Sequence, residues 1–172
     1  REKSAVPLVF LTYLNPVFHY GYDSFFAQCQ KSGLDGIIIP DLPFEEQGEV
    51  REFSSRCGVD LISLIAPTSE ERVQEIARSA TGFLYLVSSL GVTGMRSNIV
   101  TDLGGMIAKV KAGSNLPVAV GFGIHSPAQA AEIGKIADGV IVGSAIVKII
   151  EEQGEAAGPF IYEYVKSMKG AL

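Results

Sequence analysis

The sequence contains only two cysteines and two histidines, and neither pair has the spacing of a metal site. Cys29 and Cys57 lack a CxxC partner, so we expect two reduced thiols packed on helices, as in a cytoplasmic protein. His19 and His125 lie too far apart in the chain to indicate a metal site by spacing. Each histidine therefore takes a structural or surface role by default, and no bound metal is predicted.

Basic clusters and long apolar runs are also missing. The chain carries 14 Lys and Arg against 19 Asp and Glu, a net charge of -5, which argues against nucleic acid or an acidic membrane surface as a partner. No apolar run approaches the roughly 20 residues that span a bilayer. A small anionic ligand stays possible, because backbone amides can bind it without any charged side chain.

Apolar strand-like runs alternate with amphipathic helical patterns along the whole chain. The runs lie near 7–12, 36–40, 60–65, 83–88, 117–121 and 139–142. This alternation is typical of an α/β fold with a parallel sheet and outer helices. No low-complexity linker or change of composition divides the chain, so residues 1–172 are predicted to form a single domain.

Two glycine turns in the stretch 117–150 carry the strongest functional signal. The run Pro117–Gly121 turns through Gly123 into a helix start, where Ser126 is the predicted N-cap and Gln129 completes a capping box. The second run leads through Gly143 into a helix with Ser144 as predicted N-cap. Unpaired N–H groups at such helix starts form an anion site with the positive end of the helix dipole.

The same two turns have a plainer reading, in which each glycine only permits a tight strand-to-helix connection. For one turn we would favour that reading. Two consecutive units near the end of the chain match the phosphate site that follows strands 7 and 8 of a TIM barrel, so we predict that they bind phosphate.

Polar residues also follow the two earliest runs. Asn15 and Pro16 are predicted to end the first strand, and the next helix is expected at about Asp23–Ser32. Flanking prolines place Asp41 beyond the second strand, at the end of the sheet where barrel ligands bind. Asp41 could act as a general base or fix its own turn, and the sequence favours neither role.

Five motifs, taken together and in this order, resemble the tryptophan synthase alpha subunit family. They are Tyr13-Leu14-Asn15-Pro16, Pro40-Asp41-Leu42-Pro43, Gly91-Val92-Thr93-Gly94, Gly121-Phe122-Gly123-Ile124 and Gly143-Ser144-Ala145-Ile146-Val147. The resemblance implies a TIM (β/α)8 barrel that cleaves indole-3-glycerol phosphate into indole and glyceraldehyde 3-phosphate by a retro-aldol reaction. It implies no cofactor in this subunit, and a beta-subunit partner that carries pyridoxal phosphate in an alpha2beta2 complex.

The resemblance also assigns residue roles. The implied phosphate-binding residues are Thr93, Gly94, Phe122, Gly123, Gly143 and Ser144. The implied substrate pocket is lined by Leu11, Ile38 and Tyr85. Asn15 and Asp41 fall in loops that face the partner subunit in the family, which turns the reading of Asp41 towards a structural or signalling role.

By motif, the two catalytic carboxylates of the family, a Glu and an Asp, fall upstream of Arg1. We therefore expect no catalytic residue in this chain, about six of the eight βα units (units 3 to 8), and no turnover by the chain alone. Without the first two strands, the strands at 7–12 and 139–142 are expected to be open apolar edges.

Two other functions remain open at this point. One is another phosphate-binding barrel, such as a sugar-phosphate isomerase or epimerase, with Asp41 as the base. The other is a non-catalytic module that binds phosphate or activates a partner without lyase activity.

Overall fold

Parallel strands and outer helices alternate throughout the computed structural model, which describes residues 4–66, 72–87, 103–121 and 123–172. The strands are β1 (Val9–Leu11), β2 (Gly36–Ile38), β3 (Asp60–Leu61), β4 (Ser63–Ile65), β5 (Leu84–Val87), β6 (Val118–Gly121) and β7 (Gly139–Ile141). The helices are α1 (Leu14–Tyr20), α2 (Tyr22–Ser32), α3 (Gly48–Arg56), α4 (Val73–Ser79), α5 (Leu103–Gly113), α6 (Pro127–Gly134), α7 (Ser144–Gln153) and α8 (Ala157–Lys169), with 3-10 turns η1 (Phe44–Glu46) and η3 (Gly154–Ala156).

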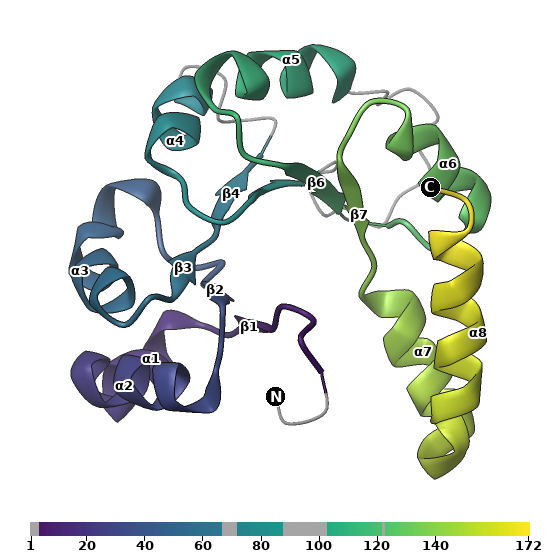
Figure 1. Cartoon of the computed structure of the whole chain (residues 1–172), viewed down its shortest axis with the longest axis horizontal. Helices are drawn as coiled ribbons and strands as arrows, with labels where there is room; N and C mark the ends of the chain where they lie inside the picture. The colour runs from purple at the N-terminus through teal and green to yellow at the C-terminus, as the bar shows by residue number, and fades with distance from the viewer. Residues whose placement is uncertain (1–3, 67–71, 88–102, 122) are drawn as a thin grey trace.

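The strands form an open ring with the helices outside it (Figure 1). They pair in parallel in the order β1-β2-β3 and β4-β5-β6-β7. Only Ile62 separates β3 from β4, so one continuous run links the two sheets. Each of the six predicted strands is present, the third being divided into β3 and β4, and the predicted α/β barrel architecture is confirmed.

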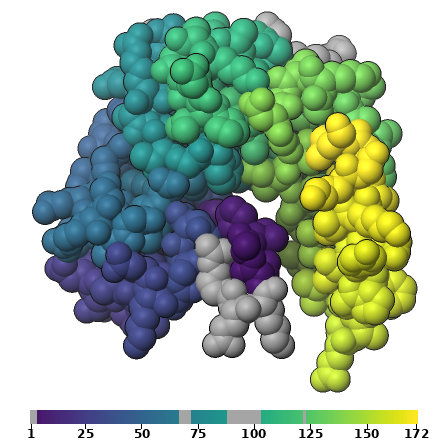
Figure 2. Space-filling view, in the orientation of Figure 1, coloured from purple at the N-terminus to yellow at the C-terminus, as the bar shows by residue number. Residues whose placement is uncertain are grey.

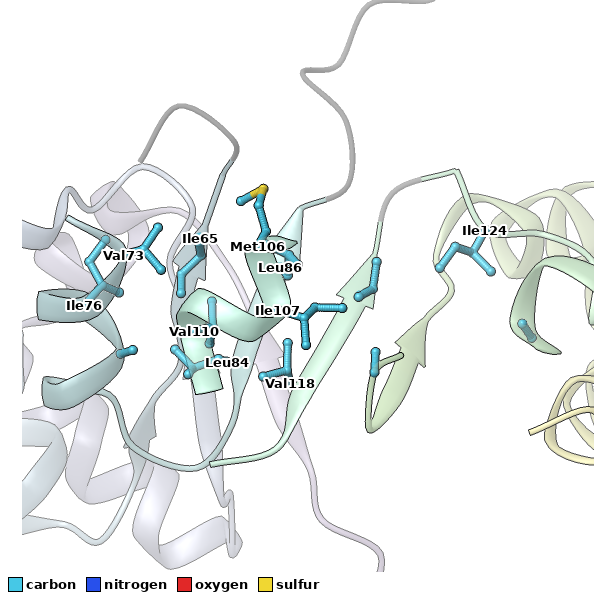
Figure 3. Packing of buried hydrophobic residues seen from close by; sticks show 14 of the residues in the cluster. Ile65, Val73, Ile76, Leu84, Leu86, Met106, Ile107, Val110, Val118 and Ile124 are labelled. Carbon is cyan, nitrogen blue, oxygen red and sulfur yellow. The ribbon is translucent and has the colours of Figure 1, made fainter. Parts of the chain in front are cut away.

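Two hydrophobic clusters hold the helices on the outside of the ring. One lies beneath α1, α2 and α3 and includes Val17, Phe26 and Ile37. The other lies beneath α4, α5 and α6, where Leu84 and Leu86 of β5 are fully buried (Figure 3). Burying a leucine side chain contributes about 1.5–3 kcal/mol, so these strand residues fix the outward face of each strand.

The opposite face of the strands lines the inside of the ring. Leu64, Tyr85, Ala119 and Gly139 are register partners across β4, β5, β6 and β7, and all four are half-buried. Side chains alternate between the two faces of a strand, so this row points away from the outer helices. The inward row is therefore the surface available to a ligand.

Helix α1 was not predicted. Asn15 and Pro16 do end the strand region, but they lie inside the first turn of α1 instead of in a loop. Proline is tolerated there because the first N–H groups of a helix have no partner within the helix. Gly21, with φ +85, then separates α1 from α2, which begins at Tyr22, one residue before the expected Asp23.

The two outer strands are open. Within the described residues β1 pairs only with β2, and β7 pairs only with β6. Phe10 and Leu11 of β1 are exposed, and Figure 2 shows a hollow between the purple segment that includes β1 and the helices α7 and α8. Among the described residues, the open strand edges predicted at 7–12 and 139–142 are present, but exposed apolar side chains are found on β1, whereas Val140 and Val142 of the β7 region pack against the outer cluster.

The aspartates just before β2 and β7 each accept a backbone hydrogen bond at the start of the adjacent strand, β1 and β6 respectively. Asp35 Oδ2 accepts a hydrogen bond from Leu8 N–H at 2.7 Å, and Asp138 Oδ2 accepts one from Val118 N–H at 2.9 Å. Lys111 Nζ lies 3.0 Å from the Asp138 carboxylate. The hydrogen bond from Val118 N–H makes the largest contribution to lowering the pKa of Asp138 below its ordinary value, and the Lys111 ammonium makes the next largest.

We predict that Asp138→Asn destabilises the fold by about 1 kcal/mol near neutral pH, since a charge-assisted bond to a backbone N–H becomes a weaker one. Because the folded pKa is lowered, this contribution is present above the unfolded carboxyl pKa of about 3.9 and is lost as the pH falls through the folded value. Urea unfolding across this pH range measures the difference. The exposed-site variant Glu151→Gln is the control, and a penalty for Asp138→Asn that persists at the acid end would contradict the assignment.

Candidate functional site

The turn after β6 begins with a glycine that needs its special conformation. Gly123 has φ +80, a region that residues with a Cβ adopt at a cost. Ile124 is buried in the outer cluster and anchors the turn. Helix α6 then starts with the predicted capping box: Gln129 N–H donates to Ser126 Oγ at 3.3 Å, and Ser126 N–H donates to Gln129 Oε1 at 3.1 Å. The predicted N-cap at Ser126 is confirmed.

The turn after β7 differs from its prediction. Gly143, and not Ser144, is the N-cap of α7, and Ser144 is the first helical residue. Ile146 N–H and Val147 N–H both donate to Gly143 O, so the helix begins one residue earlier than expected. The prediction was wrong because serine and glycine are both favoured at the N-cap, and glycine takes this position without a side-chain hydrogen bond.

Both turns leave backbone donors available. Among the described residues, no acceptor pairs with the N–H groups of Gly123 and Ile124 after β6, or of Ser144 and Ala145 after β7. The two strands are adjacent and parallel, with Gly121 opposite Ile141, so both turns leave the sheet at its carboxyl edge. Four free donors at one edge, two of them at the positive end of a ten-residue helix, can bind an anion.

Gly121 was not among the predicted site residues, but the Tyr85 side chain leaves no room for a Cβ at this position. A Cβ placed on Gly121 would lie 2.5 Å from Tyr85 Cε2 and from its hydroxyl oxygen, so the ring lies directly on the glycine backbone. Burial raises the pKa of Tyr85, and the phenol therefore stays neutral and protonated. A glycine ending a Val-Ala-Val strand was the available signal, but only the structure identifies its partner.

The predicted pocket residues lie on the ring strands. Leu11 and Ile38 are direct register partners on β1 and β2; Leu11 is 65% exposed and Ile38 7%. Tyr85 is on β5, in the other sheet, on the inward row described above. The structure thus brings the first two together and places the third beside the β6 turn.

The two loop residues predicted to face a partner are joined through the backbone of α1. Leu14 N–H, at the start of this helix, donates to Asp41 Oδ1 at 2.9 Å. Asn15 is the next residue and is exposed, as are the neighbouring aromatic side chains Tyr13 and Phe18. Asp41 therefore ties the loop after β2 to the helix after β1.

Three predicted phosphate residues, Thr93, Gly94 and Phe122, lie outside the described residues. Within the ranges that are described, no group of three His, Cys, Asp or Glu side chains could hold a metal ion. Nor is any described helix both long enough and apolar enough to cross a membrane.

Comparison with known proteins gives consistent matches. A family model described as tryptophan synthase alpha chain matches residues 1–169. The tryptophan synthase alpha chain of Lactiplantibacillus plantarum is 51% identical over 173 residues, and that of Lacticaseibacillus casei 46% over 172. Both alignments include 100% of this chain but 65% of the relative, so the chain spans about two thirds of their length.

Solved structures of the same kind are similar in fold. Tryptophan synthase subunit alpha from Campylobacter jejuni has a TM-score of 0.85 and 34% identity, covering 96% of this chain and 66% of that one. A structure of the tryptophan synthase a2b2 complex from Pyrococcus furiosus has a TM-score of 0.87 and 37% identity, covering 99% and 69%. These neighbours place the open ring of strands as part of a TIM barrel.

We predict that Gly121→Ala destabilises the fold by about 1–3 kcal/mol, because the new methyl group overlaps the Tyr85 ring. Chemical denaturation measures the loss, and the same substitution in a Tyr85→Ala background should cost almost nothing. Gly139→Ala is the matched control, since its Cβ would meet only Ala119 Cβ at 3.9 Å. Equal penalties with and without the Tyr85 ring would contradict this contact.

Proposed function

This chain belongs to the tryptophan synthase alpha chain family, and from that membership we propose that it supplies the phosphate-binding side of a barrel that cleaves indole-3-glycerol phosphate. The products are indole and glyceraldehyde 3-phosphate, formed by retro-aldol cleavage of the bond to ring carbon C3. Residues 1–172 are taken as one domain that corresponds to βα units 3 to 8 of that barrel.

One observation carries the proposal: the two glycine turns after adjacent parallel strands, with four N–H groups that the described residues leave without acceptors. Phosphate is a strong multiple acceptor, and the α7 dipole favours its negative charge. Gly143 adds access, because a Cβ there would meet nothing within 4 Å and the backbone can approach a ligand oxygen closely. In this assignment, Gly123, Gly143 and Ser144 bind the phosphate.

The apolar part of the substrate is assigned to the inside of the ring. Ile38 and Leu11 offer aliphatic surface on β2 and β1, and Tyr85 offers a neutral aromatic ring beside the β6 turn. These are the residue types that suit an indole ring, which buries apolar surface and stacks on aromatic side chains.

We assign the acid–base chemistry of the cleavage to none of the described carboxylates. Cleavage needs a proton delivered to the indole ring and another taken from the glycerol hydroxyl, and positioned acid–base groups contribute about 10²–10⁴-fold. Asp41 was the one carboxylate considered as a possible general base from the sequence. Its side chain already accepts a hydrogen bond from the Leu14 N–H. We therefore propose that residues 1–172 by themselves bind phosphate and do not turn over substrate.

The partner is proposed to be a tryptophan synthase beta subunit, which would hold the pyridoxal phosphate. The P. furiosus structure named above is of an a2b2 complex. On this chain, Tyr13, Asn15 and Phe18 are exposed at the N-cap and within α1, whose first N–H group is bound by Asp41. Aromatic residues are enriched at protein interfaces, so this group is the proposed partner-facing surface.

Ser144→Asp tests the phosphate assignment. A carboxylate in the first turn favours the α7 dipole, so the fold should be as stable as before, but its charge repels phosphate. Calorimetric titration with glycerol 3-phosphate should show binding to the unmodified chain and at least a tenfold weaker binding to the variant. Ser55→Asp, at an exposed site on α3, adds the same charge as a control. Equal affinities for Ser144→Asp and Ser55→Asp would contradict the site.

An indole-release assay tests whether residues 1–172 bind phosphate without cleaving the substrate. With indole-3-glycerol phosphate as substrate, residues 1–172 should release no indole above the uncatalysed rate, while still binding glycerol 3-phosphate. Clear turnover by these residues would overturn the assignment of the acid–base pair. Binding of glycerol 3-phosphate without any binding of indole to the pocket would favour a sugar-phosphate isomerase or epimerase instead.

A further inference from the structure

The last helix of the chain is hydrogen-bonded to the turn that follows β6. Tyr164 of α8 donates from its hydroxyl to His125 O at 3.0 Å, a contact that spans 39 residues of sequence. The Tyr164 ring packs against the outer hydrophobic cluster, which fixes the position of the hydroxyl. Burial raises the pKa of Tyr164, so the hydroxyl stays protonated and can donate at neutral pH.

The side chain of His125 in turn contacts Gly123. Its Nδ1 lies 2.8 Å from Gly123 O, and because a carbonyl oxygen only accepts, Nδ1 holds the proton in this arrangement. The backbone N–H of His125 donates to Gln129 Oε1 at 2.9 Å, which joins the residue to the capping box of α6. His125 is therefore held on one side by α6 and on the other by α8.

Fixing the Gly123 carbonyl also fixes a donor of the candidate site. The peptide bond is planar and trans, so the Gly123 C=O and the Ile124 N–H point in opposite directions. When His125 holds the carbonyl on one side of the turn, the Ile124 N–H is directed to the other. Gly123, at φ +80, has the freedom of a glycine and would otherwise populate several backbone conformations.

We propose that Tyr164 and His125 are positioning residues for the phosphate group: together they hold the Gly123–Ile124 peptide so that its N–H meets a phosphate monoester. The proposal rests on the proposed function, because it concerns the same phosphate site. Neither side chain needs to touch the ligand. Both act through the orientation of one backbone peptide, which lowers the entropic cost of ordering the turn upon binding.

Tyr164→Phe is the direct test, since it keeps the packed ring and removes only the hydroxyl. One neutral hydrogen bond corresponds to about a two- to tenfold change in affinity, so the dissociation constant of inorganic phosphate should rise by that factor. Tyr162→Phe, two residues away on α8 and exposed, is the matched control and should leave the constant unchanged. A role in stability alone would lower the unfolding midpoint of Tyr164→Phe without changing the dissociation constant, and that result would overturn the proposal.

His125→Phe tests the second link. It should weaken phosphate binding at least as much as Tyr164→Phe, and the double variant should lose less than the product of the two single losses, because both act on one peptide. Independent, fully multiplicative losses would overturn the shared action. If the unmodified chain binds no inorganic phosphate, the proposed function itself fails and the positioning role falls with it; binding by all variants with equal affinity refutes only the positioning role.

Discussion

The candidate site depends on backbone N–H groups for which the described residues provide no acceptor. The first N–H groups of any helix lack partners within the helix, and a parallel sheet brings successive strand ends, with the helices that follow them, to one edge. In this chain β6 and β7 are neighbours in register, so their two glycine turns contribute donors to the same place. Because no charged side chain is required, an acidic chain of net charge -5 can still offer an anion site.

The packing of the ring supports this edge from both sides. On the outside, Leu84 and Leu86 are buried against the helices, which fixes the direction of Tyr85 between them. On the inside, the Tyr85 ring lies on Gly121, the last residue of β6, and so occupies the space beside the turn that carries Gly123. The open edge at β1, with Phe10 and Leu11 exposed, shows where apolar surface of the ring is still uncovered.

Local features of the sequence were predictable, and contacts across the chain were not. The strands follow from apolar runs such as 36–40, and the start of α6 from its capping box, because both signals lie within a few residues. Helix α1 was missed because Asn15 and Pro16 also suit a turn, and Ser144 was misplaced by one residue because serine and glycine both serve as N-caps.

Two hydrogen bonds that hold loops in place join residues far apart in sequence. Leu14 is 27 residues from Asp41, and His125 is 39 residues from Tyr164, so no local pattern could reveal either pair. The fold class and the two glycine turns could thus be predicted from the sequence, whereas the contact of Tyr164 with the turn after β6 and that of Asp41 with the start of α1 required the structure.

The most direct test of the account is an amide NMR titration of the unmodified chain with inorganic phosphate. The N–H resonances of Gly123, Ile124, Ser144 and Ala145 should shift together along one saturation curve, while residues at the opposite edge of the sheet, such as Asp35 and Asp138, stay unchanged. Shifts confined to lysine-bearing surfaces, or no saturable shift at these four amides, would contradict the claim that the two turns form one phosphate site.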